Sequence, residues 1–148
     1  VEIGSRERFT IWCVGEEGNR CFWVDSEGVT FSNAPNLKGP LVFRLVRDFT
    51  DRDIGIGDIV LEPNFFENLK KAFKFLDDTG IAANELKIEN LKFREVVAHT
   101  SSGPDILFSL EQDPTFGMGV VKSLKESGEW DVLNYLDLRV DGRAYYSQ

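Results

Sequence analysis

The most regular part of the sequence is YLDLRVDGRAYYS, residues 135–147 near the C-terminus. Residues 135–140 alternate between side chains that suit a core and side chains that suit water, which is the period of a half-buried β-strand. Asp141-Gly142 is a preferred two-residue type I′ turn, and residues 143–147 then form the returning strand. The stretch therefore predicts an antiparallel β-hairpin at the C-terminal end.

The N-terminal part of the chain predicts a second hairpin. Residues 8–14 and 21–25 are rich in β-branched and aromatic residues, and a polar turn with glycine and asparagine separates them. Other strand-like runs follow the same reasoning. They cover residues 29–31, 41–46, 86–98 and 106–110.

Two segments have a helical pattern instead. Residues 63–79 place apolar side chains at helical spacing, with Pro63 in the first turn and Gly80 after the last. A shorter helix is expected over residues 114–127, after an aspartate that suits the N-cap. The sum is an α+β fold, a mostly antiparallel sheet flanked by two helices, with the C-terminal hairpin providing an edge strand.

Length, charge and composition exclude several functions. The 148 residues suffice for one domain with its own core. Lys and Arg number 17 against 25 Asp and Glu, and a net charge of −8 disfavours binding to nucleic acid or to anionic membrane surfaces. One histidine and two cysteines are too few for the common zinc sites, so we expect no metal and no cofactor.

The two cysteines are the first candidate for chemistry. In a hairpin centred on residue 17, Cys13 lies directly opposite Cys21, and opposed Cβ atoms are ~4.5–5.5 Å apart. A cross-strand disulfide is feasible at this separation and would favour an extracytoplasmic setting. Two reduced cysteines packed side by side fit the pattern equally well.

No enzymatic motif stands out. The acidic loop at residues 51–62 partly matches an EF-hand but has Gly55 and Ile56 where the fifth and sixth loop positions need a ligand and a glycine. His99 is followed by Thr100 and two serines at the end of a strand, and no Gly-x-Ser-x-Gly elbow exists. We therefore expect a solvated turn, a histidine without a catalytic role, and a protein that is not an enzyme.

The last strand offers a different activity. As an edge strand, residues 143–147 would carry unpaired N–H and C=O groups, which can template a partner's strand. Tyr145 and Tyr146 favour protein interfaces, although the two rings can equally divide between core and surface, with another segment covering the edge. If a partner docks here, a proline at Tyr145 should abolish its capture.

Several motifs, in this order, resemble the FtsQ/DivIB family of bacterial cell-division proteins. The family pattern is a Glu-Arg pair, an apolar strand ending in Trp, "Val-Asp-x-x-Gly-x-x-Phe", and near the end "Tyr-Ile-Asp-Leu-Arg". The matching segments are Glu7-Arg8, the strand to Trp12, Val24-Asp25-Ser26-Glu27-Gly28-Val29-Thr30-Phe31, and Tyr135-Leu136-Asp137-Leu138-Arg139. The order of helices and strands between these motifs also fits, so the resemblance covers nearly the whole chain.

The resemblance implies a non-catalytic scaffold on the extracytoplasmic face of the cell membrane. Residues 1–12 would be the end of a POTRA-type domain and its junction, and residues 13–148 the β-domain. The chain begins with Val1, so we expect the rest of the POTRA domain and a single-pass anchor upstream. The family captures FtsB or DivIC by adding a strand to its last strand, with FtsL bound alongside.

The family's partner-binding surface can be carried over by position. It comprises Arg139, Val140, Gly142, Arg143, Ala144, Tyr145 and Tyr146. Val140 departs from the pattern, because some members have tyrosine there. Two other functions stay open on the sequence alone: a small extracytoplasmic hydrolase that uses a pair of carboxylates, and an adaptor of another envelope complex with POTRA modules.

Overall fold

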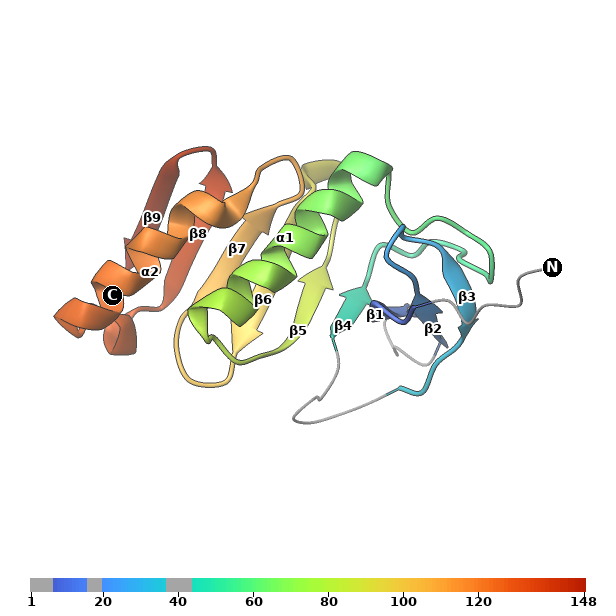
Figure 1. Cartoon of the computed structure of the whole chain (residues 1–148), viewed down its shortest axis with the longest axis horizontal. Helices are drawn as coiled ribbons and strands as arrows, with labels where there is room; N and C mark the ends of the chain where they lie inside the picture. The colour runs from blue at the N-terminus through green and yellow to red at the C-terminus, as the bar shows by residue number, and fades with distance from the viewer. Residues whose placement is uncertain (1–6, 16–19, 37–43) are drawn as a thin grey trace.

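The structure is a computed structural model that describes residues 7–15, 20–36 and 44–148. Across these ranges the strands form one nine-stranded sheet in the order β3-β2-β1-β4-β5-β6-β7-β8-β9 (Figure 1). The strands are β1 Thr10–Val14, β2 Arg20–Val24, β3 Thr30–Asn33, β4 Leu45–Asp48, β5 Ala83–Ile88, β6 Glu95–Thr100, β7 Asp105–Ser109, β8 Tyr135–Val140 and β9 Arg143–Ser147. The helices are α1 Pro63–Thr79 and α2 Gly117–Ser127, with short 3-10 turns at Leu91–Phe93, Pro114–Phe116 and Glu129–Val132.

The sheet is mixed. Five of its strand pairings are antiparallel, and three are parallel: β1 with β4, β4 with β5, and β7 with β8. A parallel pairing needs a crossover connection, and α1 supplies the one between β4 and β5 while α2 supplies the one between β7 and β8. Both helices lie on the same face of the sheet (Figure 1). The expected α+β class and the two helices are thus present, in a sheet with more parallel pairing than expected.

The main core lies between the helices and that face of the sheet. α1 has the predicted bounds: Pro63 opens it, and Gly80 ends it in the left-handed region, at φ 70°. Its apolar stripe packs against every second side chain of the strands, and together they form one hydrophobic cluster. Buried members of this cluster include Trp12, Val46, Phe66, Leu69, Phe73, Phe75, Leu86, Val96, Ile106, Phe108, Leu136 and Leu138.

Some elements differ in detail from the expectations. The apolar run over 86–98 is two strands, β5 and β6, because a 3-10 turn at Leu91–Phe93 reverses the chain. The strand expected over 41–46 is β4, which starts at Leu45, and residues 41–43 lie outside the described ranges. The boundary expected between residues 12 and 13 falls inside β1, which pairs with β2 and β4.

The Val-Asp-x-x-Gly segment forms a structural turn after β2. The Asp25 carboxylate accepts hydrogen bonds from the backbone N–H groups of Glu27, at 2.9 Å, and Val29, at 3.0 Å. Gly28 has φ 88°, and a Cβ at this position would lie 3.1 Å from the ring of Phe66 on α1. The motif therefore shapes a tight turn against the first helix.

A buried carboxylate joins β1 to β4 and the following loop. Asp48 is 1% exposed, and it accepts hydrogen bonds from the Trp12 indole at 2.9 Å, the Thr50 backbone at 2.9 Å and the Arg52 guanidinium at 2.5 Å. Burial acts to raise the pKa of Asp48, but the hydrogen bonds from Thr50, Arg52 and Trp12 outweigh it and hold the pKa below its usual value. Asp48 is therefore ionised at neutral pH.

Candidate partner-binding edge

The two edges of the sheet differ in the hydrogen bonds that they make with the rest of the chain. At one end, the loop between β4 and α1 hydrogen-bonds along the segment that leads into β3: Thr30 N–H donates to Asp58 O, Gly57 N–H to Thr30 O, and Val60 N–H to Gly28 O, all at 2.8–3.0 Å. At the other end, no strand of the described ranges pairs with the outer side of β9. β9 is therefore the free edge (Figure 1).

The backbone pattern identifies which groups face outward from β9. Asp105 N–H donates to Asn134 O at 3.1 Å across the parallel β7–β8 pair, so Leu136 directs its backbone groups toward β7, and Tyr135 and Asp137 direct theirs toward β9. Asn134 lies just before β8 and divides its groups, because its N–H donates to Ser147 O of β9 at 2.8 Å. The partners of Tyr135 and Asp137 on β9 are Ser147 and Tyr145. Ala144 and Tyr146 consequently direct their N–H and C=O groups away from the sheet.

This assignment corrects the expectation for Tyr145. Its N–H faces β8, so a proline there would remove a bond within the sheet, and the outward donor belongs to Tyr146. The two rings lie on opposite faces, since Tyr146 pairs with the buried Leu136 and Tyr145 pairs with Asp137. Both rings are about half exposed, at 48% for Tyr145 and 47% for Tyr146.

The hairpin of β8 and β9 contains all seven residues carried over by resemblance. Val140 pairs with Arg143 around the turn, and Gly142 has the positive φ, 72°, that a type I′ turn requires. The side chain of Val140 is 46% exposed. An apolar and aromatic surface therefore flanks the free backbone edge.

Arg139 points over the sheet and away from the edge. Its guanidinium hydrogen-bonds to Asp137, with its closest contact at 2.7 Å, and to Glu95 on β6 at 2.8 Å. The hydrogen bonds from Arg139 hold the pKa of Asp137 below its usual value, because they stabilise the charged carboxylate. Arg139 is thus already engaged with two acids of its own chain.

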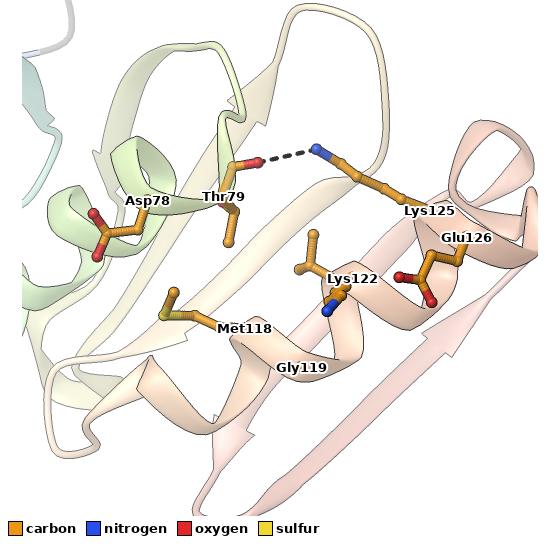
Figure 2. Close-up of a pocket in the computed structure, with 8 residues that line it drawn as sticks. Asp78, Thr79, Met118, Gly119, Lys122, Lys125 and Glu126 are labelled. Carbon is orange, nitrogen blue, oxygen red and sulfur yellow. Dashed lines mark hydrogen bonds between the residues drawn. The ribbon is translucent and has the colours of Figure 1, made fainter.

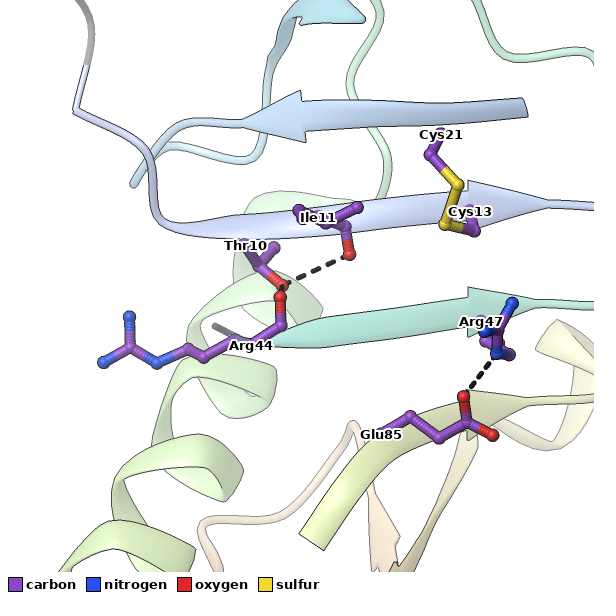
Figure 3. The surroundings of a disulfide bond; sticks show 7 residues. All are labelled: Thr10, Ile11, Cys13, Cys21, Arg44, Arg47 and Glu85. Carbon is purple, nitrogen blue, oxygen red and sulfur yellow. Dashed lines mark hydrogen bonds and ion pairs between the residues drawn. A yellow bond between two sulfur atoms is a disulfide. The ribbon is translucent and has the colours of Figure 1, made fainter. Parts of the chain in front are cut away.

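The paired cysteines lie at the other end of the sheet (Figure 3). Cys13 pairs with Cys21 in the expected register, their Cα atoms are 4.0 Å apart, and their sulfur atoms are at bonding distance. They are almost fully buried in a small second core, on the face opposite the helices, with Ile11, Trp23 and Leu45. The disulfide therefore fastens β1 to β2 within a packed apolar cluster.

Two other candidates receive structural roles. Within the EF-hand-like loop, the Asp58 carboxylate accepts the N–H of Gly55 at 2.8 Å, and the described residues contain no group of three metal ligands. His99 lies inside β6, and its Nδ1 is 2.9 Å from a carboxylate oxygen of Asp105 on β7. Sequence reasoning missed this pairing because it depends on the register of two strands.

The structure has open grooves on both faces. One, of about 460 Å³, runs between the end of α1 and α2, where Met118 and Lys122 lie on α2 and Lys125 reaches the Thr79 carbonyl at 3.0 Å (Figure 2). A second, of about 380 Å³, adjoins Trp130. The third, of about 440 Å³, lies on the helix-free face and contains Asp105 and Asp137.

The third groove bears on the hydrolase alternative. A carboxylate-pair hydrolase needs one acid with a raised pKa as proton donor and one ionised partner. Asp137 has a lowered pKa and a guanidinium on it, so it suits the ionised role alone. Asp105 lies 2.9 Å from the Nδ1 of His99, so both acids of this groove have a partner within the chain.

Comparisons with known protein families and with curated proteins found no match to this chain. Among the helices of the described ranges, none is both long enough and apolar enough to span a bilayer.

Proposed function

We propose that this chain is the partner-recruiting β-domain of a bacterial cell-division scaffold of the FtsQ/DivIB type. In this role it has no catalytic activity and works on the extracytoplasmic side of the membrane, held there by a membrane anchor upstream. It captures an FtsB- or DivIC-like protein by strand addition at β9, with an FtsL-like protein alongside. Capture brings these partners to the complex that builds the septum.

The observation that carries the proposal is the difference between the two sheet ends. A loop of the chain hydrogen-bonds to Gly28 and Thr30, at the start of the β3 edge, whereas no strand of the described ranges pairs with the outer side of β9, toward which Ala144 and Tyr146 direct their backbone groups. An uncovered edge is a liability for aggregation unless a partner occupies it. Four of the exposed large apolar or aromatic side chains gather on the same hairpin: Tyr135, Val140, Tyr145 and Tyr146.

The motifs that carry the family resemblance support the same proposal. Val24 to Gly28 builds a turn against α1, and Tyr135 to Arg139 is the strand on which β9 rests. The buried pair Cys13–Cys21 suits an oxidising compartment outside the cytoplasm. Each of these features has a place in an extracytoplasmic docking domain.

Proline at Tyr146 tests the proposal. Tyr146→Pro removes an outward N–H without removing a bond to β8, and proline is tolerated at such edge positions. We expect the variant to stay folded and to bind the extracytoplasmic segment of the FtsB- or DivIC-like protein from the same genome at least tenfold more weakly, since one lost backbone bond is worth about 1 kcal/mol and strand pairing beyond the proline is also blocked. Isothermal titration calorimetry measures the affinity.

Two variants serve as controls for this experiment. Tyr146→Ala keeps the N–H and loses the ring, so it separates the backbone contribution from that of the side chain. Ser32→Pro alters β3, the edge at the far end of the sheet, and should leave binding unchanged if it folds. Full affinity of a folded Tyr146→Pro variant would contradict strand addition at β9.

The POTRA-adaptor alternative shares the same docking edge and differs in its partners. It predicts several tandem POTRA modules in the coding sequence upstream, where the division scaffold predicts one transmembrane helix and a single module. Depletion of the protein in its host distinguishes the two in cells: loss of division gives filaments, whereas loss of a secretion adaptor leaves septation intact.

A further inference from the structure

The helix-free face of the sheet carries a groove of about 440 Å³ over β6, β7 and β8. Six side chains line it: Val97, Asp105, Leu107, Tyr135, Asp137 and Arg139. The opposite face of the same strands is buried beneath α1 and α2 (Figure 1). The groove is therefore the exposed half of strands whose other half makes the core.

Strand register arranges the lining residues in a regular pattern. Asp105 on β7 lies beside Tyr135 on β8, and Leu107 lies beside Asp137 in the next row of the same face. Val97 on β6 lies on the other side of Leu107. Asp105 and Asp137 therefore lie diagonally opposite each other in a group of four residues. Leu107 and Tyr135 occupy the other two positions.

The polar groups of the groove are held in place by their neighbours. Asp105 is fixed by His99, with 2.9 Å between oxygen and Nδ1, and Asp137 is fixed by Arg139, at 2.7 Å. Arg139 also contacts Glu95, at 2.8 Å. Two carboxylates, those of Asp137 and Glu95, therefore contact the Arg139 guanidinium, and Asp105 lies in the row next to that of Asp137. The groove and its rim thus carry three acids and one arginine. Lys87 of β5 lies beside Val97, with its ammonium group 3.6 Å from Glu85.

Carboxylates beside aliphatic and aromatic side chains complement a positively charged group carried on an aliphatic stem. The stem would lie over Val97 and Leu107, and the charge would meet Asp105 and Asp137, with the ring of Tyr135 available for a cation–π contact. Small metal ions fit poorly, because they need several converging oxygen ligands and have no use for the apolar floor. Anions are disfavoured by the charge of the face.

We propose that this groove binds a lysine or arginine side chain presented by a partner protein. The site is separate from strand addition, since it uses side chains of the helix-free face and none of the outward backbone groups of β9. It lies one strand in from the free edge, because Tyr145 on β9 is the neighbour of Asp137. A partner bound to the β9 edge or to the helix-free face can therefore place a basic side chain in the groove.

Methyl and aromatic NMR spectra of the folded chain test the proposal. The probe is the peptide acetyl-Gly-Lys-Gly-amide, compared with the norleucine peptide of the same length and with n-butylammonium. We expect saturable shifts of the Val97 and Leu107 methyl groups and the Tyr135 ring with the lysine peptide and with n-butylammonium, which carries the same charged stem, and none with the norleucine peptide. Raising the salt concentration to 0.5 M should weaken binding, because the Debye length shortens.

Matched variants locate the site. Asp105→Asn should weaken binding of the lysine peptide about threefold, the usual size of a partly exposed ion pair, and Tyr135→Leu should weaken it similarly. Asp131→Asn changes an exposed carboxylate beside the separate groove at Trp130 and should have no effect. A thermal melt of each variant confirms that it is folded before binding is compared.

Three outcomes would overturn the proposal. Equal shifts with the norleucine peptide would mean that charge is irrelevant. Equal losses in Asp105→Asn and Asp131→Asn would mean that only the net charge of the protein attracts the probe. Failure of n-butylammonium to shift the same methyl groups and ring would mean that the groove does not recognise the charged stem on which the proposal rests.

Discussion

Gly28 is constrained both by its backbone and by its neighbour. Its φ of 88° lies where residues with a Cβ are rarely found, and the ring of Phe66 occupies the space that a Cβ would need. The Asp25 carboxylate stabilises the same turn by accepting two backbone hydrogen bonds. The Asp-x-x-Gly spacing is therefore explained by the packing of one turn on one helix.

Alanine at Gly28 should destabilise the fold by roughly 1–3 kcal/mol, from backbone strain together with the displaced Phe66 ring. Gly15 is a matched control, because its φ is 87° and a Cβ there meets nothing within 4 Å. Gly15→Ala should cost only the strain, about 1 kcal/mol. Urea unfolding followed by tryptophan fluorescence measures both, and equal losses would show that the Phe66 contact is unimportant.

At the scale of elements, the hairpin of β1 and β2 carries its own covalent link. The link closes a short loop, since Cys13 and Cys21 are 8 residues apart, and it lies in a cluster that the helices do not cover. β1 is also the strand that joins the hairpin to the rest of the sheet through β4. The stability of this end of the sheet therefore depends on the hairpin.

Replacing both cysteines by alanine should lower the free energy of unfolding by about 2–3 kcal/mol, since a loop of this length is constrained by that amount in the unfolded chain. Intact mass of the wild-type protein with and without reductant reports the bond directly, through a difference of two hydrogens. A protein that gains no mass on reduction, and whose denaturation midpoint does not respond to dithiothreitol, would have no disulfide.

The edge strands show how two similar elements acquire different roles. β3 and β9 are both short terminal strands, but the 55–60 loop hydrogen-bonds to Gly28 and Thr30 at the start of β3, whereas within the described ranges β9 pairs with β8 alone. The distinction between Tyr145 and Tyr146 also arises at this scale, because it follows from the hydrogen-bond pattern that β7 imposes on β8. A proline scan of β9 should therefore alternate between loss of stability and loss of binding.

For the whole molecule, the ionised carboxylates predict the response to acid. The pKa values of Asp48, Asp113 and Asp137 are all lowered in the folded protein. A lowered folded-state pKa contributes stability above the unfolded value and loses it as the pH falls through the folded value. These three groups therefore act in the same direction.

We expect the urea midpoint to be nearly constant from pH 7 to pH 5 and to fall as the pH drops below about 4, the ordinary range of aspartate. Asp48→Asn should be less stable than wild type at pH 7, by roughly 2–4 kcal/mol, because Arg52 loses its buried partner. Its midpoint should also fall less steeply below pH 4. Parallel curves for the two proteins would mean that Asp48 does not contribute to acid sensitivity.

The local features of this protein can be predicted from its amino-acid sequence. The bounds of α1, the turn at Asp141-Gly142, the opposition of Cys13 and Cys21, and the α+β class all follow from patterns a few residues long, because helices and hairpins are specified by neighbouring residues. The candidate edge strand at residues 143–147 follows from the same short-range pattern, and the partner-binding residues between Arg139 and Tyr146 follow from the family resemblance.

The remaining features depend on contacts between distant segments. The three parallel pairings, the loop that hydrogen-bonds to the start of β3, the contact of Arg139 with Glu95 and the pairing of His99 with Asp105 all join segments that local patterns do not connect. Strand order depends on how α1 and α2 bury their apolar stripes against one face, and this is a property of the assembled core. The outward N–H of Tyr146 and the groove on the opposite face exist because that packing fixes which strand ends the sheet and which face remains open.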